Sequence, residues 1–237
     1  YFKPTSYKSH KHIIQRQSII NHIKPCIIKS QCIIELGSGK GDLAKAIILN
    51  NPYNFITGIA GTGKTLLAVQ IALDLYFTRK VNKIVITRPT VSNEDNGYLP
   101  GSLAEKMEPW LVPIKSNMRK VYNKPTQLES MEKEESIELV SLSHFAGRTF
   151  ENSVVIVDEF QNLTKAQLSM AVGRLGRNSI MMFTGDPQQI DLKSRNDSAI
   201  HEIPKLKSSK YVYTVVLTEN HRHESLQEIL KLLTEYN

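Results

Sequence analysis

The stretch Gly58-Ile-Ala-Gly-Thr-Gly-Lys-Thr65 constrains this chain more than any other part of its sequence. It fits the phosphate-binding pattern G-x-x-x-x-G-K-[ST], which works only between a strand and a helix. That context is present, because an apolar, β-prone run ends at Thr57 and a helical run follows over residues 66–75. The sequence therefore predicts a nucleoside triphosphate site inside an α/β domain.

Each position of this loop has an expected task. Glycines let the backbone close round an anion, and the N-terminus of the following helix adds partial positive charge. Lys64 is expected to reach the β- and γ-phosphates, and the Thr65 hydroxyl to bind Mg²⁺. The remaining positions would offer backbone N–H groups to the phosphates: Gly58, Ile59, Ala60, Gly61, Thr62 and Gly63. A plain glycine turn between a buried strand and a buried helix is the alternative.

A second informative stretch is the β-branched run of residues 153–157, which ends in Asp158 and Glu159. A buried parallel strand carries such acids to the sheet edge where ligands bind. There Asp158 is expected to hold Mg²⁺ through water and Glu159 to polarise the attacking water. A simple strand-end acid pair is the alternative, and the phosphate loop argues against it.

Three more apolar runs predict strands with polar residues at their ends. Residues 83–87 would deliver Arg88 to the ligand edge, and residues 180–184 lead to a turn in which Gln189 could sense the γ-phosphate. Residues 211–217 precede Arg222, which could place a fixed charge on the phosphoryl group, although a surface arginine is an equal alternative. Residues 137–142 alternate as a further strand would.

The middle of the chain carries weaker patterns. Residues 90–112 hold Asn96-Gly97, Pro100-Gly101 and Pro109, which is turn chemistry rather than a long helix. From residue 115 to 138 the sequence is charged and loses apolar periodicity, which predicts an exposed excursion or flexible insertion.

Residues 1–50 are expected to form an N-terminal extension to a core of residues 51–237, helical and with a glycine-rich loop at 37–41. That loop, with Glu35 before it, is similar to the first loop of an S-adenosylmethionine methyltransferase. The methyltransferase fold needs a second strand ending in an acid, whereas the next strand here runs into the phosphate loop. Cys26 and Cys32 lack zinc-site spacing and are expected to be buried thiols.

Net charge is compatible with a polyanionic partner. The chain carries 30 basic and 23 acidic residues, or +7, with a pI near 9.3. Residues 129–138 hold five acids and one base, so the remainder carries 29 minus 18, or +11. A solvated basic surface is the alternative. No apolar run approaches the roughly 18 residues of a membrane span, and no signal segment is visible, so we expect a cytoplasmic location and no membrane role.

Several of these stretches, in this order, resemble the PhoH-like family of P-loop ATPases. Besides the phosphate loop they are Arg88-Pro89, Leu99-Pro-Gly101, the segments 147–152 and 158–164, Gly173-Arg-Leu-Gly176 and Gly185-Asp-x-x-Gln-Ile-Asp-Leu192. The resemblance runs from about Asn51 to the end of the chain. It implies a three-layer, RecA-like α/β core with a mostly parallel sheet and helices on both faces, related to superfamily 1 helicases.

The same resemblance implies an ATPase that uses Mg²⁺, is linked to RNA or possibly DNA, and forms a homo-oligomeric ring. It makes Lys64, Thr65, Asp158, Glu159 and Gln189 the nucleotide machinery. Candidates for phosphate charge are Arg88, Arg174 and Arg222, and either of the last two could act across a subunit boundary. The chain departs from the family where an adenine-reading glutamine is expected, because residues 39–42 hold none.

Two other functions share the phosphate loop. A nucleotide-switched binding or assembly module would bind ATP and turn it over slowly. A small-molecule kinase would need an acceptor-binding lid, which the sequence does not show, and the acid pair suits activation of water better.

Overall fold

The structure is a computed structural model that describes residue 48, residues 50–89, residues 103–218 and residue 225. Over residues 103–111 it describes the helix and not the side chains. The predicted extension with its glycine-rich loop and cysteines, residues 90–102 and Arg222 lie outside the described residues, apart from Ile48 and Asn50.

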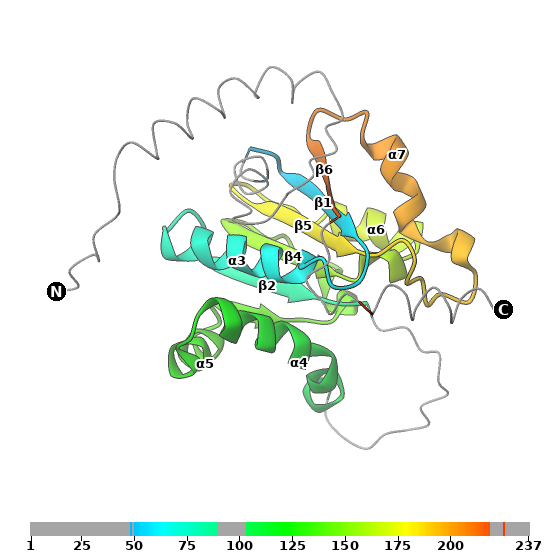
Figure 1. The fold of residues 1–237 in the computed structure, drawn as a ribbon. Coiled ribbons are helices and arrows are strands. Elements are labelled where there is room, and N and C mark those ends of the chain that lie inside the picture. The colour runs from blue at the N-terminus through cyan, green and yellow to red at the C-terminus, as the bar shows by residue number, and fades with distance from the viewer. Residues whose placement is uncertain (1–47, 49, 90–102, 219–224, 226–237) are drawn as a thin grey trace, which may run out of the picture.

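A six-stranded, all-parallel sheet forms the centre of the fold, with strand order β3-β2-β4-β5-β1-β6 (Figure 1). Parallel sheets are covered on both faces, so their strands are continuous apolar runs. In β4 every residue is buried, and the predicted strands on either side of it are confirmed. The strands are β1 (Tyr53–Gly58), β2 (Lys83–Thr87), β3 (Ile137–Leu139), β4 (Ser153–Asp158), β5 (Ile180–Gly185) and β6 (Val212–Leu217).

Helices cover both faces of this sheet. On one face α3 (Lys64–Phe77), α4 (Leu103–Val121) and α5 (Pro125–Lys133) pack over alternate strand residues such as Ile56 and Ile84. The other face packs residues such as Phe55 and Val85 under α6 (Lys165–Val172) and α7 (Ile203–Leu206). Short 3-10 turns complete this second layer: η1 (Leu142–Phe145), η2 (Phe160–Asn162), η3 (Arg195–Asp197) and η4 (Ala199–Glu202). The predicted three-layer α/β architecture is confirmed.

The charged segment of residues 115–138 differs from its prediction. It contains the end of α4, all of α5 and the start of β3, and it buries Met118, Leu128 and Met131 in the core cluster with α3 and the sheet. The segment is therefore helical and packed on the core rather than a flexible insertion, while most of its side chains are exposed as expected. At the end of α4 the apolar residues Ile114, Met118 and Val121 do recur at helical spacing, but the nearby Pro113 and Pro125 and the many charged residues favour an interrupted chain.

Two smaller boundaries also differ. Helix α4 begins at Leu103, so the expected turn chemistry over residues 90–112 is wrong from that residue onward, although Pro109 and Pro113 would normally interrupt a helix. The strand predicted for residues 137–142 ends at Leu139, and η1 follows from Leu142. Among the described residues, no helix has the length and apolar character needed to cross a bilayer.

The strand order decides where ligands can bind. Strand β5 lies between β1, which leads into the phosphate loop, and β4, which ends in Asp158. Thr184 near the end of β5 is in register with Asp158, and Gly185 is in register with Thr57 of β1. The loop, the acids and the end of β5 therefore meet at the carboxyl edge of the sheet, the edge that binds ligands in open α/β folds.

Candidate nucleotide site

The phosphate loop joins β1 directly to the N-terminus of α3. Gly63 is the N-cap of α3 and has a left-handed backbone with φ of 81°, which favours glycine. A side chain at Gly58 would come within 2.4 Å of the Leu217 carbonyl oxygen, so only glycine fits beside β6. The first N–H groups and the positive end of α3 thus face the loop, which is the arrangement that binds phosphate.

Two side chains of the loop turn back onto its own backbone. The Lys64 ammonium donates to the Ile59 carbonyl over 2.9 Å, and the Thr62 hydroxyl donates to the same oxygen over 2.9 Å. The Lys64 ammonium therefore lies against the phosphate loop, where it is expected to bind the β- and γ-phosphates.

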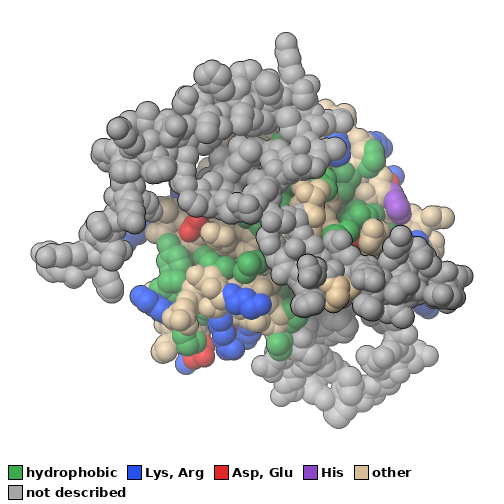
Figure 2. Space-filling model, in the orientation of Figure 1, with side chains coloured by type: hydrophobic (Ala, Val, Ile, Leu, Met, Phe, Trp, Pro, Cys, Tyr) green, Lys and Arg blue, Asp and Glu red, His purple; other side chains and the backbone are tan. Residues whose placement is uncertain are grey.

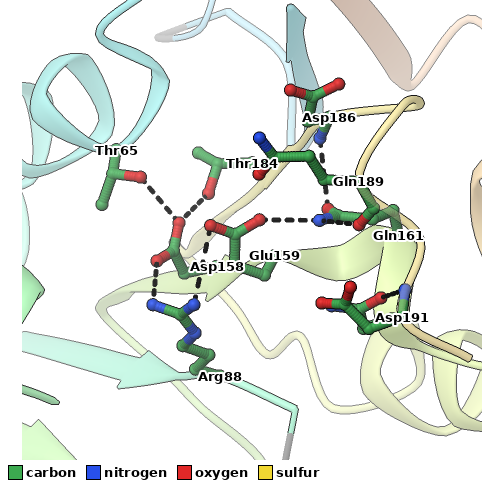
Figure 3. Close-up of polar contacts among 10 residues, drawn as sticks. Thr65, Arg88, Asp158, Glu159, Gln161, Thr184, Asp186, Gln189 and Asp191 are labelled. Atoms are coloured by element: carbon green, nitrogen blue, oxygen red, sulfur yellow. Dashed lines mark hydrogen bonds and ion pairs between the residues drawn. The ribbon is translucent and has the colours of Figure 1, made fainter. Parts of the chain in front are cut away.

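Asp158, at the end of β4, joins the loop to the sheet (Figure 3). The residue is 2% exposed, and its Oδ1 accepts hydrogen bonds from the hydroxyls of Thr65, over 2.8 Å, and Thr184. Hydroxyl and carboxylate oxygens are the hard ligands that Mg²⁺ prefers, and Mg²⁺ usually keeps waters and substrate phosphates as further ligands. Thr65 and Asp158 therefore fit the metal role expected for them.

Arg88 follows β2 and faces both acids. One guanidinium nitrogen lies 3.9 Å from Asp158 Oδ2, and the other lies 3.8 Å from Glu159 Oε1. Its positive charge partly compensates two carboxylates that stand side by side at a largely buried edge.

Glu159 sits in an unusual backbone conformation directly after β4. Its φ of 55° is left-handed, a strained state for a residue with a side chain that occurs most at functional sites. Burial and the neighbouring charge of Asp158 raise the pKa of its carboxyl, while the Gln161 hydrogen bond and the charges of Arg88 and Lys64 oppose that rise. A carboxylate with a raised pKa is a better proton acceptor, as its expected role requires.

The turn of residues 185–189 is tied to the same cluster. Gln161 donates from Nε2 to Glu159 Oε2 over 2.7 Å and to the Gln189 carbonyl over 2.9 Å. The Gln189 side chain itself is exposed at this edge. Gln161 and Thr184 have no role predicted from the sequence. Thr184 is a polar residue at the end of an apolar run, and Gln161 belongs to the segment 158–164 that carries the family resemblance, so both signals could have singled them out.

Arg174 lies elsewhere. Its carbonyl accepts from the N–H of Phe150, just before β4 begins, and its side chain donates to Met170 in α6. Asp158 is at the far end of β4, and a six-residue strand is roughly 17 Å long. The structure thus brings together Lys64, Thr65, Arg88, Asp158 and Glu159, with the backbone of Gln189, and places Arg174 at the opposite edge.

Comparison with known proteins agrees with this geometry. The family model described as PhoH-like protein matches residues 33–234. The chain is 42% identical over 148 residues to a PhoH-like protein of Bacillus subtilis, covering 62% of this chain and 46% of that protein. It is 35% identical over 190 residues to a PhoH-like protein of Mycobacterium leprae, covering 78% of this chain and 54% of the relative. The chain thus spans about half the length of these curated relatives.

A solved structure shares the fold. The large terminase from a thermophilic bacteriophage superposes with a TM-score of 0.51 at 9% identity, covering 78% of this chain and 45% of that one. The all-parallel sheet with helices on both faces and a phosphate loop after β1 is the RecA-like arrangement of P-loop proteins. The chain therefore belongs to the PhoH-like family, and its core is a P-loop nucleotide-binding domain of that family.

Proposed function

We propose that this domain hydrolyses ATP with Mg²⁺ at the carboxyl edge of the sheet. One observation carries the proposal: the hydroxyls of Thr65 and Thr184 both donate hydrogen bonds to Asp158, and the neighbouring Glu159 carboxylate faces the Arg88 guanidinium. A metal-binding pair, a base and fixed positive charge are the parts that phosphoryl transfer to water requires.

In the proposed reaction, the oxygen of a water molecule attacks the γ-phosphorus of ATP. The bond from that phosphorus to the β–γ bridging oxygen breaks, Glu159 accepts the proton of the water, and ADP and inorganic phosphate leave. Lys64 and Arg88 would balance negative charge on the phosphate oxygens. Mg²⁺ on Thr65 and Asp158 would supply further positive charge there.

We extend the proposal to a nucleic-acid partner, with RNA as the expected class and DNA as the comparison. Support comes from the basic surplus, which lies outside residues 129–138, and from Lys and Arg side chains that gather over α4 in Figure 2. Exposed basic residues of α4 and of the link that follows it include Arg119, Lys120 and Lys124. Polyanion binding through such residues weakens as salt rises.

Phosphate release tests this function. The parent chain, Lys64→Ala and Glu159→Gln are assayed with ATP and Mg²⁺, each with and without single-stranded RNA, and with DNA of the same sequence. We expect Lys64-dependent release that RNA increases, and a loss of about 10²- to 10⁴-fold in Glu159→Gln, the usual contribution of a general base.

Other outcomes point to the other functions. Release that is absent from the parent, or equal in parent and Lys64→Ala, contradicts the proposed hydrolysis. Tight ATP binding with ATP-dependent assembly and negligible turnover would favour the assembly module. Transfer of phosphate to a small acceptor in place of water would favour a kinase.

A further inference from the structure

Gln161 is a buried amide whose hydrogen-bonding groups are all used. It is 1% exposed and belongs to η2, the short turn that follows Glu159. One N–H of its Nε2 donates to Glu159 Oε2, the other donates to the Gln189 carbonyl, and its Oε1 accepts the N–H of Asp186. Two acceptors on one side and a donor on the other permit only one orientation of the amide.

These bonds join two parts of the site that the sequence separates by about one strand and one helix. Glu159 follows β4, whereas Asp186 and Gln189 follow β5. The Gln161 amide spans the gap between them, because it bonds the Glu159 carboxylate and the backbone of the 185–189 turn at once.

The surroundings hold Gln161 in place from two further directions. The Ser198 hydroxyl donates to the Gln161 carbonyl, which ties its backbone to the segment before η4. A β-carbon at Gly185 would come within 2.8 Å of Gln161 Oε1 and 2.7 Å of the Phe160 ring, so the strand end is shaped to the amide. A side chain fixed in this way can hold a neighbour within the narrow geometry that catalysis requires.

We propose that Gln161 is a positioning residue that locks the Glu159 carboxylate to the 185–189 turn, so that the water-activating base and the turn carrying Gln189 keep one relative geometry. The inference rests on the proposed hydrolysis and assigns a residue to it. Gln161 does not touch the reacting atoms; it acts through Glu159 and the turn.

The matched control is Asn162, the next residue of the same turn. Asn162 is also buried, but its amide exchanges hydrogen bonds with Asp191, over 3.1 and 2.8 Å, rather than with Glu159. Asn162→Ala and Gln161→Met therefore each remove one buried amide from η2, but only Gln161→Met removes the hydrogen bond to the Glu159 carboxylate. Gln161→Glu keeps the side-chain length and the acceptor for Asp186 while removing both donors.

The test is a double-mutant cycle on kcat. Phosphate release, affinity for a non-hydrolysable ATP analogue and Tm are measured for the parent, Gln161→Met, Glu159→Gln, the double variant and Asn162→Ala. We expect Gln161→Met to lower kcat by about 10- to 100-fold, the usual effect of a group that orients an active-site ligand or base, with analogue affinity within about 3-fold. In the Glu159→Gln background, Gln161→Met is expected to lower kcat by less than about 3-fold, because the effects of coupled residues are not additive.

The outcomes distinguish a failure of the positioning role from a failure of the proposed hydrolysis. The positioning role is overturned if the kcat losses of Gln161→Met and Glu159→Gln are fully additive. It is also overturned if Gln161→Met loses no more kcat than Asn162→Ala does. Should Gln161→Met fail to fold, Gln161→Glu and Gly185→Ala stand in for it, and unchanged kcat in both also overturns that role. A parent without Lys64-dependent hydrolysis instead overturns the proposed function and this inference with it.

Discussion

Asp158 is the residue at which the phosphate loop and two strands of the sheet meet. Its Oδ1 is bonded by Thr65 from the loop side and by Thr184 from β5, and both neighbours are neutral hydroxyls. Such donors orient a carboxylate without neutralising it, so the charge stays available to a cation. We therefore propose that Thr184 supports the proposed metal role of Asp158, although Thr184 is not itself an expected metal ligand.

Replacing Thr184 with valine tests this at the residue scale. The change keeps the shape of a fully buried side chain and removes one hydrogen bond from Asp158. A hydrogen bond of about 1 kcal/mol predicts a rise of roughly 5-fold in the Mg²⁺ concentration that gives half-maximal phosphate release. Thr57→Val, at the end of β1 with its hydroxyl toward Val215, is the control, and an equal rise there would contradict the role of Thr184.

At the scale of elements, the edge strand β3 is held by charge as well as by its backbone pairing with β2. The Glu138 carboxylate accepts two hydrogen bonds from Arg148, over 2.7 and 2.8 Å, and lies 2.8 Å from the Lys83 ammonium of β2. The Arg148 guanidinium in turn lies 5.0 Å from the centre of the Phe150 ring. Arg148 and Lys83 lower the pKa of Glu138 from 4.5 to about 2. A three-residue strand gains an anchor in this way.

This anchor predicts a pH-dependent difference between the parent and Glu138→Gln. A lowered folded pKa means that the stabilisation is complete above the unfolded value of 4.5 and is lost as pH falls toward about 2. Urea unfolding at pH 7 should show Glu138→Gln less stable by about 1 kcal/mol, the scale of a partly exposed ion pair. The gap should narrow steadily below pH 4.5. An equal gap at pH 3 and pH 7, or a similar gap for Glu129→Gln at an exposed position of α5, would rule out this anchor.

The whole molecule separates its nucleotide edge from the edge that carries Arg174. Within one chain, Arg174 lies about a strand length from Asp158, as estimated from strand rise. An arginine at that edge can reach a nucleotide only on another copy of the chain. The oligomeric ring expected from the family resemblance would supply such a copy, and we keep it as a proposal, together with Arg222 as the other candidate.

Subunit mixing tests this arrangement. Lys64→Ala subunits carry both arginines and cannot use ATP, whereas Arg174→Ala or Arg222→Ala subunits keep an intact phosphate loop. If one of these arginines acts across the boundary, mixing its variant with Lys64→Ala should release more phosphate than the average of the two separate samples. Native mass measured with and without ATP gives the size of the assembly. A monomer under both conditions, or no gain on mixing, contradicts action between subunits.

Much of the core could be predicted from local pattern, for a physical reason. A strand buried on both faces must be apolar throughout, and a phosphate loop must have glycine where the backbone turns left-handed or approaches another strand. The strands β1, β2, β4 and β5, and the expected pairing of Lys64 and Thr65 with Asp158 and Glu159 as one site, follow from those requirements. Helices α4 and α5 did not. Pro109 and Pro113 within α4 are residues that normally interrupt a helix, and the few apolar residues of the charged α5 indicate a helix only when a surface is there to bury them.

The sequence alone therefore determined the class of fold, the phosphate loop and the acids that face it, because each depends on residues adjacent in the chain. The tertiary structure decided what depends on strand order. It placed β5 between β1 and β4, so that Thr184 reaches Asp158 and Gln161 spans from Glu159 to the 185–189 turn. It also placed Arg174 at the opposite edge. Contacts between segments far apart in the chain leave no periodicity in any one of them, so only the folded arrangement assigns these residues their neighbours.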